Sequence, residues 1–244
     1  MKRLHVPRIN ARYWAAITLA SIFGTNLGDL YAHESGLGIG LGLLLLAAIV
    51  VMAMLAERIE NLPHEAWYWF AIILIRTGAT NIADYLAFRV RVPPLALTLG
   101  LAALIALFGW LSVRRAKEET KTHTRLPSTN ASYWVAMLGA GVFGTVLGDI
   151  CSHAVGKGAA SVGLDVLLAL ALFARSRAAA KTVALYWLTV AVARTAGTAM
   201  GDWLAETKAL HIGLPLSTLL TGIAFTATLL LWRSRRATGR MQEA

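Results

Sequence analysis

The sequence predicts an all-α membrane protein with eight transmembrane helices, arranged as four parallel two-helix repeats. Of its 244 residues, 57% are hydrophobic and only 15% are charged, whereas soluble domains are about 45–50% apolar and about 25% charged. Charged segments separate eight apolar stretches, and a Tyr-Trp pair marks every second stretch. Backbone groups in lipid must hydrogen-bond within their own segment, so these stretches are expected to be helices.

The apolar stretches are 16 to 23 residues long, enough to cross or nearly cross the hydrocarbon of a bilayer. In chain order, the expected spans are residues 12–32, 37–55, 66–88, 94–113, 131–152, 159–174, 183–204 and 213–232. The sixth is the shortest and contains Asp165, whose role the sequence leaves open. Pro94 and Pro215 open the fourth and eighth spans, where a missing backbone N–H costs nothing.

Lysine and arginine are distributed unevenly between the two ends of these spans. The termini and the segments after the second, fourth and sixth spans carry 17 of them, and the opposite side carries 4. The positive-inside rule therefore places both termini in the cytoplasm. The net charge of +10 is explained by this orientation, and we expect no nucleic-acid partner. The single cysteine, Cys151, excludes a disulfide framework.

An internal repeat dominates the chain. Residues 11–33 and 131–153 are identical at 12 of 23 positions, and residues 68–87 and 186–205 at 8 of 20. Each copy has Tyr-Trp, nine residues, then a small residue, Thr and finally Asp, with Tyr and Asp 16 residues apart. Because each unit has two spans, all units enter the membrane in the same sense. We expect two four-helix halves, 1–113 and 131–244, joined by a basic cytoplasmic loop at 114–130, with pseudo-two-fold and approximate pseudo-four-fold symmetry.

In this pattern the chain resembles a family of bacterial integral membrane proteins built from four tandem two-helix repeats, each with a marked tryptophan. The corresponding tryptophans here are Trp14, Trp69, Trp134 and Trp187. That family has no assigned function, so the resemblance implies the architecture and a location in the bacterial inner membrane, but no mechanism.

The Tyr-Trp pairs begin the motif helices at their cytoplasmic ends, which is typical of the interfacial aromatic belt. The predicted belt consists of Tyr13, Trp14, Tyr68, Trp69, Tyr133, Trp134, Tyr186 and Trp187. The small residues spaced by four, such as Gly24 and Gly28, favour close packing of helices. Local unwinding of the helix around a ligand is the alternative.

The repeated aspartates are the strongest candidates for a functional site. They are Asp29, Asp84, Asp149 and Asp202. A carboxylate inside the membrane is costly and marks a functional site by default. Sixteen residues of helix span about 24 Å, so all four are expected at one depth, near the non-cytoplasmic surface.

Other polar residues extend each aspartate into a stripe on one helix face. Thr25, Thr80, Thr145 and Thr198 lie four residues before the aspartates. His33 and His153 lie four residues after Asp29 and Asp149, and Arg76 and Arg194 lie four residues before Thr80 and Thr198. The arginines are expected either to pair with aspartates of neighbouring helices or to form a gate. Four aspartates and two arginines carry a net charge of −2, and crowded carboxylates are expected to share protons.

Oxygen ligands from Asp, Thr, Asn26 and Asn81 suit hard or borderline cations, and two imidazoles favour Mn²⁺, Fe²⁺ or Zn²⁺. Asp29, Asp149, His33 and His153 are the predicted metal ligands, with the divalent ion as substrate rather than as a resident cofactor.

Four functions remain open at this point. The first is a secondary transporter or exchanger of a cation, divalent in our expectation, coupled to protons through the aspartates. The second is a proton-coupled transporter of a small organic or anionic solute. The third is an intramembrane metal-dependent enzyme, which we do not favour, and the fourth is a structural or sensor protein. The expected partners are the lipid bilayer and a small ion or molecule, and the sequence leaves a homo-oligomer open.

Overall fold

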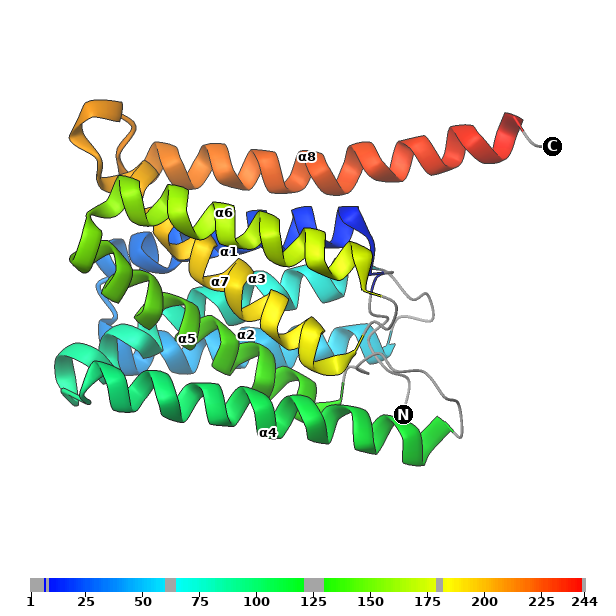
Figure 1. The fold of residues 1–244 in the computed structure, drawn as a ribbon, viewed down its shortest axis with the longest axis horizontal. Helices are drawn as coiled ribbons and strands as arrows, with labels where there is room; N and C mark the ends of the chain where they lie inside the picture. Colours follow the sequence, from blue (N-terminus) through cyan, green and yellow to red (C-terminus); the bar gives the residue numbers. More distant parts are fainter. Residues whose placement is uncertain (1–6, 8, 60–64, 121–129, 179–181, 243–244) are drawn as a thin grey trace.

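A computed structural model describes residue 7 and residues 9–59, 65–120, 130–178 and 182–242, which contain eight α-helices and no strand (Figure 1). The eight expected helices are confirmed. They are α1 (Ala11–Glu34), α2 (Gly38–Ile59), α3 (Glu65–Asp84), α4 (Pro94–Thr120), α5 (Ala131–Val155), α6 (Lys157–Arg177), α7 (Val183–Glu206) and α8 (Gly213–Gln242). A π-helical turn (Tyr85–Arg89) follows α3, and a 3₁₀ turn (Lys208–Leu210) follows α7.

The loop expected at 114–130 is shorter than predicted, because α4 continues as a helix to Thr120. Residues 121–129 lie outside the described part of the chain. Asn130 already belongs to the next helix, since its side chain caps the first turn of α5 by accepting a hydrogen bond from the Tyr133 N–H at 2.9 Å. Asn10 caps α1 in the same way.

Within the described ranges, five helices are long and apolar enough to span a membrane, which indicates a multi-pass membrane protein. They are α4 to α8, and α2 contains a shorter apolar stretch at Gly40–Ala53. Figure 1 shows that α1, α3, α5 and α7 all start at one end of the bundle, and that α8 finishes at that same end. All four two-helix units therefore run in the same sense.

The four motif helices form the centre of the molecule. Helices α1, α3, α5 and α7 pack in a closed ring, each against the next, with α7 returning to α1. The other four helices lie outside this ring. Each outer helix packs mainly on the motif helix of the following unit: α2 on α3, α4 on α5, α6 on α7, and α8 on α1. The two sequence halves are thus interlocked, because α4 packs on the second half and α8 on the first.

The small residues of the motif allow the ring helices to approach closely. A Cβ added at Gly144 of α5 would lie 2.7 Å from both the backbone carbon and the Cβ of Arg194 in α7. One added at Gly24 of α1 would lie 2.5 Å from the Arg76 Cγ in α3. The motif stays helical through this region in all four units. Of the two roles considered for the small residues, the structure therefore has close helix packing and no local unwinding of these helices.

Candidate functional site

The four repeated aspartates line one cavity at the C-terminal ends of the motif helices. This cavity, the aspartate cavity, has a volume of about 800 Å³. Asp202 is buried and the other three aspartates are half-buried. Their carboxylates are close enough to interact electrostatically. The structure therefore brings together the carboxylates that the repeat placed at one depth.

The four repeated threonines form the inner part of the same cavity, and all of them are buried. Each hydroxyl lies within hydrogen-bonding distance of the carbonyl four residues earlier, for example Thr25 Oγ1 to the Ser21 oxygen at 2.9 Å. A hydroxyl that donates to its own helix keeps its lone pairs for a partner on the axis. The threonines thus present a ring of acceptors.

The guanidinium of Arg76 fills this threonine ring. Its Nη2 donates to Thr25 Oγ1 and Thr198 Oγ1, both at 2.5 Å. Its Nη1 donates to Thr80 Oγ1 at 3.2 Å, to Thr145 Oγ1 at 2.9 Å and to the Gly141 carbonyl at 3.2 Å. One buried side chain therefore connects all four motif helices at the floor of the aspartate cavity.

Arg194 lies nearer the N-terminal ends of the motif helices. Its Nη1 donates to Ser21 Oγ at 3.2 Å, and its Nη2 lies 3.3 Å from the Met137 sulfur. Ser21 and Gly141 occupy the positions in units 1 and 3 that the arginines occupy in units 2 and 4. The small side chains at these two positions thus leave room on the axis for the two arginines.

The repeated tyrosines close the axis at its other end. Their hydroxyls form a cycle: Tyr13 to Tyr68 at 3.0 Å, Tyr68 to Tyr133 at 2.6 Å, Tyr133 to Tyr186 at 3.2 Å and Tyr186 to Tyr13 at 2.6 Å. All four side chains are fully buried. These tyrosines point to the axis of the bundle. The aromatic-belt interpretation had placed them at the lipid interface instead.

Each tyrosine also contacts two tryptophans. Within a pair the rings are T-shaped, with centroids 5.1 to 5.3 Å apart. Across units, Tyr13 contacts Trp69 with centroids 5.8 Å apart, and Tyr186 contacts Trp14 at 5.9 Å. The Tyr-Trp motif therefore joins neighbouring units around the tyrosine ring.

Neither axial arginine forms the ion pair with an aspartate that the sequence suggested. In the described part of the chain the ion pairs are Arg12 with Glu65 and Lys157 with Glu206. The reason is distance along the helix: Asp84 lies eight residues beyond Arg76, about 12 Å of rise, whereas Thr80 lies one turn away.

The predicted metal ligands do not converge. His33 and His153 line the mouth of the aspartate cavity and are exposed, and His33 Nδ1 lies 2.7 Å from the Asp29 carbonyl oxygen. Among the described residues, no three of His, Cys, Asp and Glu are grouped to hold a metal ion.

Asn26 and Asn81 lie outside the cavity lining. Asn26 Nδ2 donates to Ser217 Oγ in α8 at 2.6 Å, and Asn81 Nδ2 donates to the Gly28 carbonyl at 3.2 Å. They connect helices. Asp165, on α6, is half-buried and also lies outside the cavity lining.

Three charged residues at the cavity mouth were not predicted as part of the site, namely Arg91, Lys157 and Glu206. Lys157 and Glu206 form an exposed ion pair. Glu206 lies four residues after Asp202, the position of the histidines in units 1 and 3, so the repeat contained the signal for it.

Similarity to known proteins bears on this site only through the repeat. Residues 12–59 and 185–238 match the family model described as Repeat of Unknown Function (DUF347). These segments cover α1 with α2, and most of α7 with α8. The match supports a repeat-containing protein and assigns no activity. Neither the curated proteins nor the solved structures gave a match.

Proposed function

We propose that this protein is a secondary transporter that exchanges a cation for protons across a bacterial inner membrane. In this proposal all eight helices cross the bilayer, both termini are cytoplasmic, and the four units are related by approximate pseudo-four-fold symmetry. The observation that carries the proposal is the convergence of four carboxylates in one cavity.

The charge of the aspartate cavity favours a cation as its occupant. Five carboxylates line the cavity, those of the four aspartates and of Glu206, against two cationic side chains at the mouth, Arg91 and Lys157. The Arg76 guanidinium, bound to the threonine ring, adds one more positive charge. The threonine ring already accepts hydrogen bonds from a cationic group, that of Arg76. Because the part of the chain that the structure describes has no cluster of histidines and carboxylates that could hold a metal ion directly, we expect the cation to be hydrated or organic, held by charge and hydrogen bonds.

Proton coupling follows from the crowding of the carboxylates. Close carboxylates do not all ionise in an empty site, and a bound cation favours their ionised forms. Binding of the cation would then release protons, and its departure would let them return. This linkage is the physical basis for exchange.

The axis suggests which side of the transporter is open. The aspartate cavity lies at the end opposite the helix starts, whereas Arg76, Arg194 and the tyrosine ring occupy the rest of the axis. We therefore interpret the structure as the state open to the non-cytoplasmic side. Transport would require these two arginines and the tyrosine ring to separate, in the manner of a gate.

Flux measurements in proteoliposomes test the proposal, with a pH-sensitive dye inside the vesicles. We would compare Mn²⁺ with methylammonium as imposed cation gradients. At least one of the two cation gradients should drive proton movement in the wild type, and Asp29→Asn should reduce that proton movement at least tenfold. Asp165→Asn is the matched control, because it removes an intramembrane carboxylate outside the cavity, and it should retain the flux. Absence of proton movement with both cations, or equal loss in the two variants, would overturn the proposal.

A second candidate is a proton-coupled transporter of an anionic solute. The observation that favours it is the complete burial of Arg76 and Arg194 without a carboxylate partner among the described residues. A buried unpaired cation is costly, and an anion would offset that cost. Thermal stabilisation of the purified protein by organic anions, but not by cations, would favour this function over the first.

A further inference from the structure

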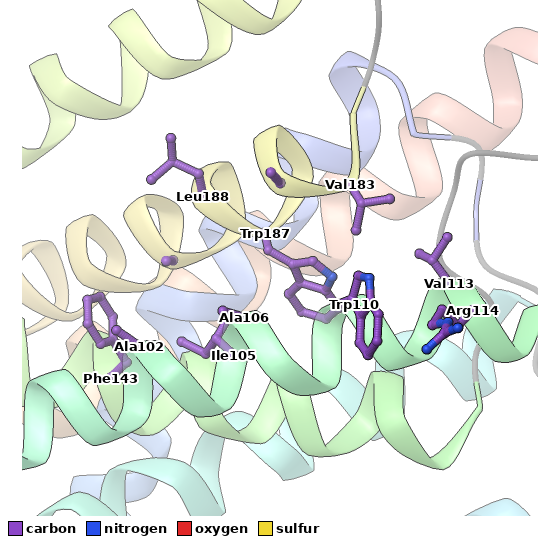
Figure 2. Close-up of a pocket in the computed structure, with 12 residues that line it drawn as sticks. Ala102, Ile105, Ala106, Trp110, Val113, Arg114, Phe143, Val183, Trp187 and Leu188 are labelled. Carbon is purple, nitrogen blue, oxygen red and sulfur yellow. The ribbon is translucent and has the colours of Figure 1, made fainter.

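A second cavity lies on the outer side of the bundle, between α4 and α7, and is independent of the transport proposal. We call it the lateral groove; its volume is about 570 Å³. Its walls are almost entirely apolar, and Arg114 is the charged residue in its lining. Figure 2 shows Arg114, Trp110 and Val183 near one end, with Ala102 and Phe143 toward the other.

The outer helices differ in the residue that they place against the tryptophans of the motif. Trp14 of α1 is covered by Arg175 of α6, whose guanidinium carbon lies 5.1 Å from the ring centroid. Trp69 of α3 is covered by Phe225 of α8, with centroids 6.0 Å apart. At the corresponding Trp187 of α7, the outer helix has Gly109 and the indole packs directly against it, since a Cβ added at Gly109 would lie 2.5 Å from Trp187 Nε1.

Beside this contact, α4 contributes both small and large residues to the groove. Ala102 and Ala106 lie in the same wall as Ile105, Trp110 and Val113, and Trp187 lines the opposite wall. The groove therefore offers an apolar space beside Trp187 for an occupant from outside the described chain.

The location of the groove indicates what that occupant is. The wall residue Leu188 is 59% exposed and Trp110 is 51% exposed, so the groove opens away from the helix ring. In a membrane protein this outer surface meets acyl chains. An apolar groove of this kind suits one acyl chain lying along α4 and α7.

The charge at one end of the groove selects among lipids. Arg114 is exposed, and its guanidinium carbon lies 4.6 Å from the Trp110 ring centroid, which holds it at the groove. A guanidinium over a ring face keeps its N–H groups free at the edge for a phosphate. It lies at the end where α7 begins, the end rich in basic residues, and basic pockets between transmembrane helices on that side bind anionic headgroups.

We propose that the lateral groove is a binding site for an anionic phospholipid. One acyl chain lies between Ala106 and Leu188, and the phosphate contacts Arg114. The occupant contacts both walls, and so stabilises the packing of α4 on α7.

Native mass spectrometry of the full-length protein tests this proposal, with phosphatidylglycerol and phosphatidylcholine of identical acyl chains as probes. The wild type should bind phosphatidylglycerol at least fivefold more tightly. Arg114→Gln should abolish this preference. The matched control is Arg177→Gln on α6, which removes an exposed arginine that also lies over an aromatic ring, Phe173, at 5.2 Å; it should leave the preference intact.

A groove-filling variant provides the second arm. Ala106→Phe should reduce the binding of both lipids, because the ring would occupy the space of the acyl chain. Equal affinity of the wild type for the two lipids, or equal loss in Arg114→Gln and Arg177→Gln, would overturn the proposal. So would a dimer that Ala106→Phe dissociates while lipid binding stays unchanged, since the groove would then hold a second copy of the chain. If Ala106→Phe does not fold, the comparison of Arg114→Gln with Arg177→Gln alone tests the proposal.

Discussion

The substitution Gly144→Ala tests the close approach of the ring helices most directly. Its new methyl group would lie 2.7 Å from the Arg194 backbone carbon and 2.9 Å from its carbonyl oxygen. Backbone atoms of a packed helix cannot move aside as the tip of a flexible side chain can, so α5 and α7 must separate. Overpacking of this kind costs about 1–3 kcal/mol.

A matched variant isolates this cost from helix propensity. Gly78→Ala, in α3, adds the same methyl group to a motif helix where no atom lies within 4 Å. Both changes gain about 1 kcal/mol because alanine is the better helix former. The difference in their free energies of unfolding should therefore equal the packing cost, about 1–3 kcal/mol.

Equilibrium unfolding in mixed micelles, followed by tryptophan fluorescence, measures both variants against the wild type. Gly78→Ala should match or exceed the stability of the wild type, and Gly144→Ala should fall below Gly78→Ala. If the two variants unfold at the same denaturant concentration, α5 and α7 are not in the close contact described here, and the packing argument for the small-residue motif fails.

Three further predictions concern the axis. Tyr68→Phe removes a hydroxyl with two partners in the tyrosine ring and should lower the free energy of unfolding by about 1 kcal/mol, while Tyr85→Phe, at an exposed ring, should leave it unchanged. Thr198→Val removes an acceptor of the Arg76 guanidinium and should cost about 1.5–3 kcal/mol in the same assay, whereas Thr228→Val, at a half-buried position of the outer helix α8, should cost far less. Cation binding, measured by isothermal titration calorimetry, should weaken as the pH falls, because protons compete with the cation for the carboxylates; a rise in affinity at low pH would contradict the exchange proposal.

Much of the fold could be predicted from the sequence, because membrane spans have a strong one-dimensional signal. A run of about 20 apolar residues is long enough to cross the bilayer, and the observed helices contain or closely follow the expected spans. The depth of the aspartates was also predictable, since helix rise converts a constant spacing into a constant level. The packing of α8 on α1 was not predictable, because the sequence of an apolar outer helix does not indicate which neighbouring helix it will contact.

The role of the axial residues was harder to predict. Tyrosine at the start of a membrane helix is typical of the lipid interface, and only the convergence of four helices brings the hydroxyls within hydrogen-bonding distance. Arg76 was expected to pair with a carboxylate because opposite charges attract. The structure favours the threonines because they lie within its reach and surround it on all sides, which no pattern within one helix could indicate.

The position of α8 has a consequence for biogenesis. Helix α1 is synthesised before all the other described helices, yet the helix that covers its outer face, α8, comes after them. The cover of α1 can therefore be completed only after α8 has been synthesised, and until then the outer face of α1 needs lipid or the insertion machinery as a substitute. A chain that terminates before residue 213 would lack this cover permanently, and cellular quality control could distinguish it from the finished protein.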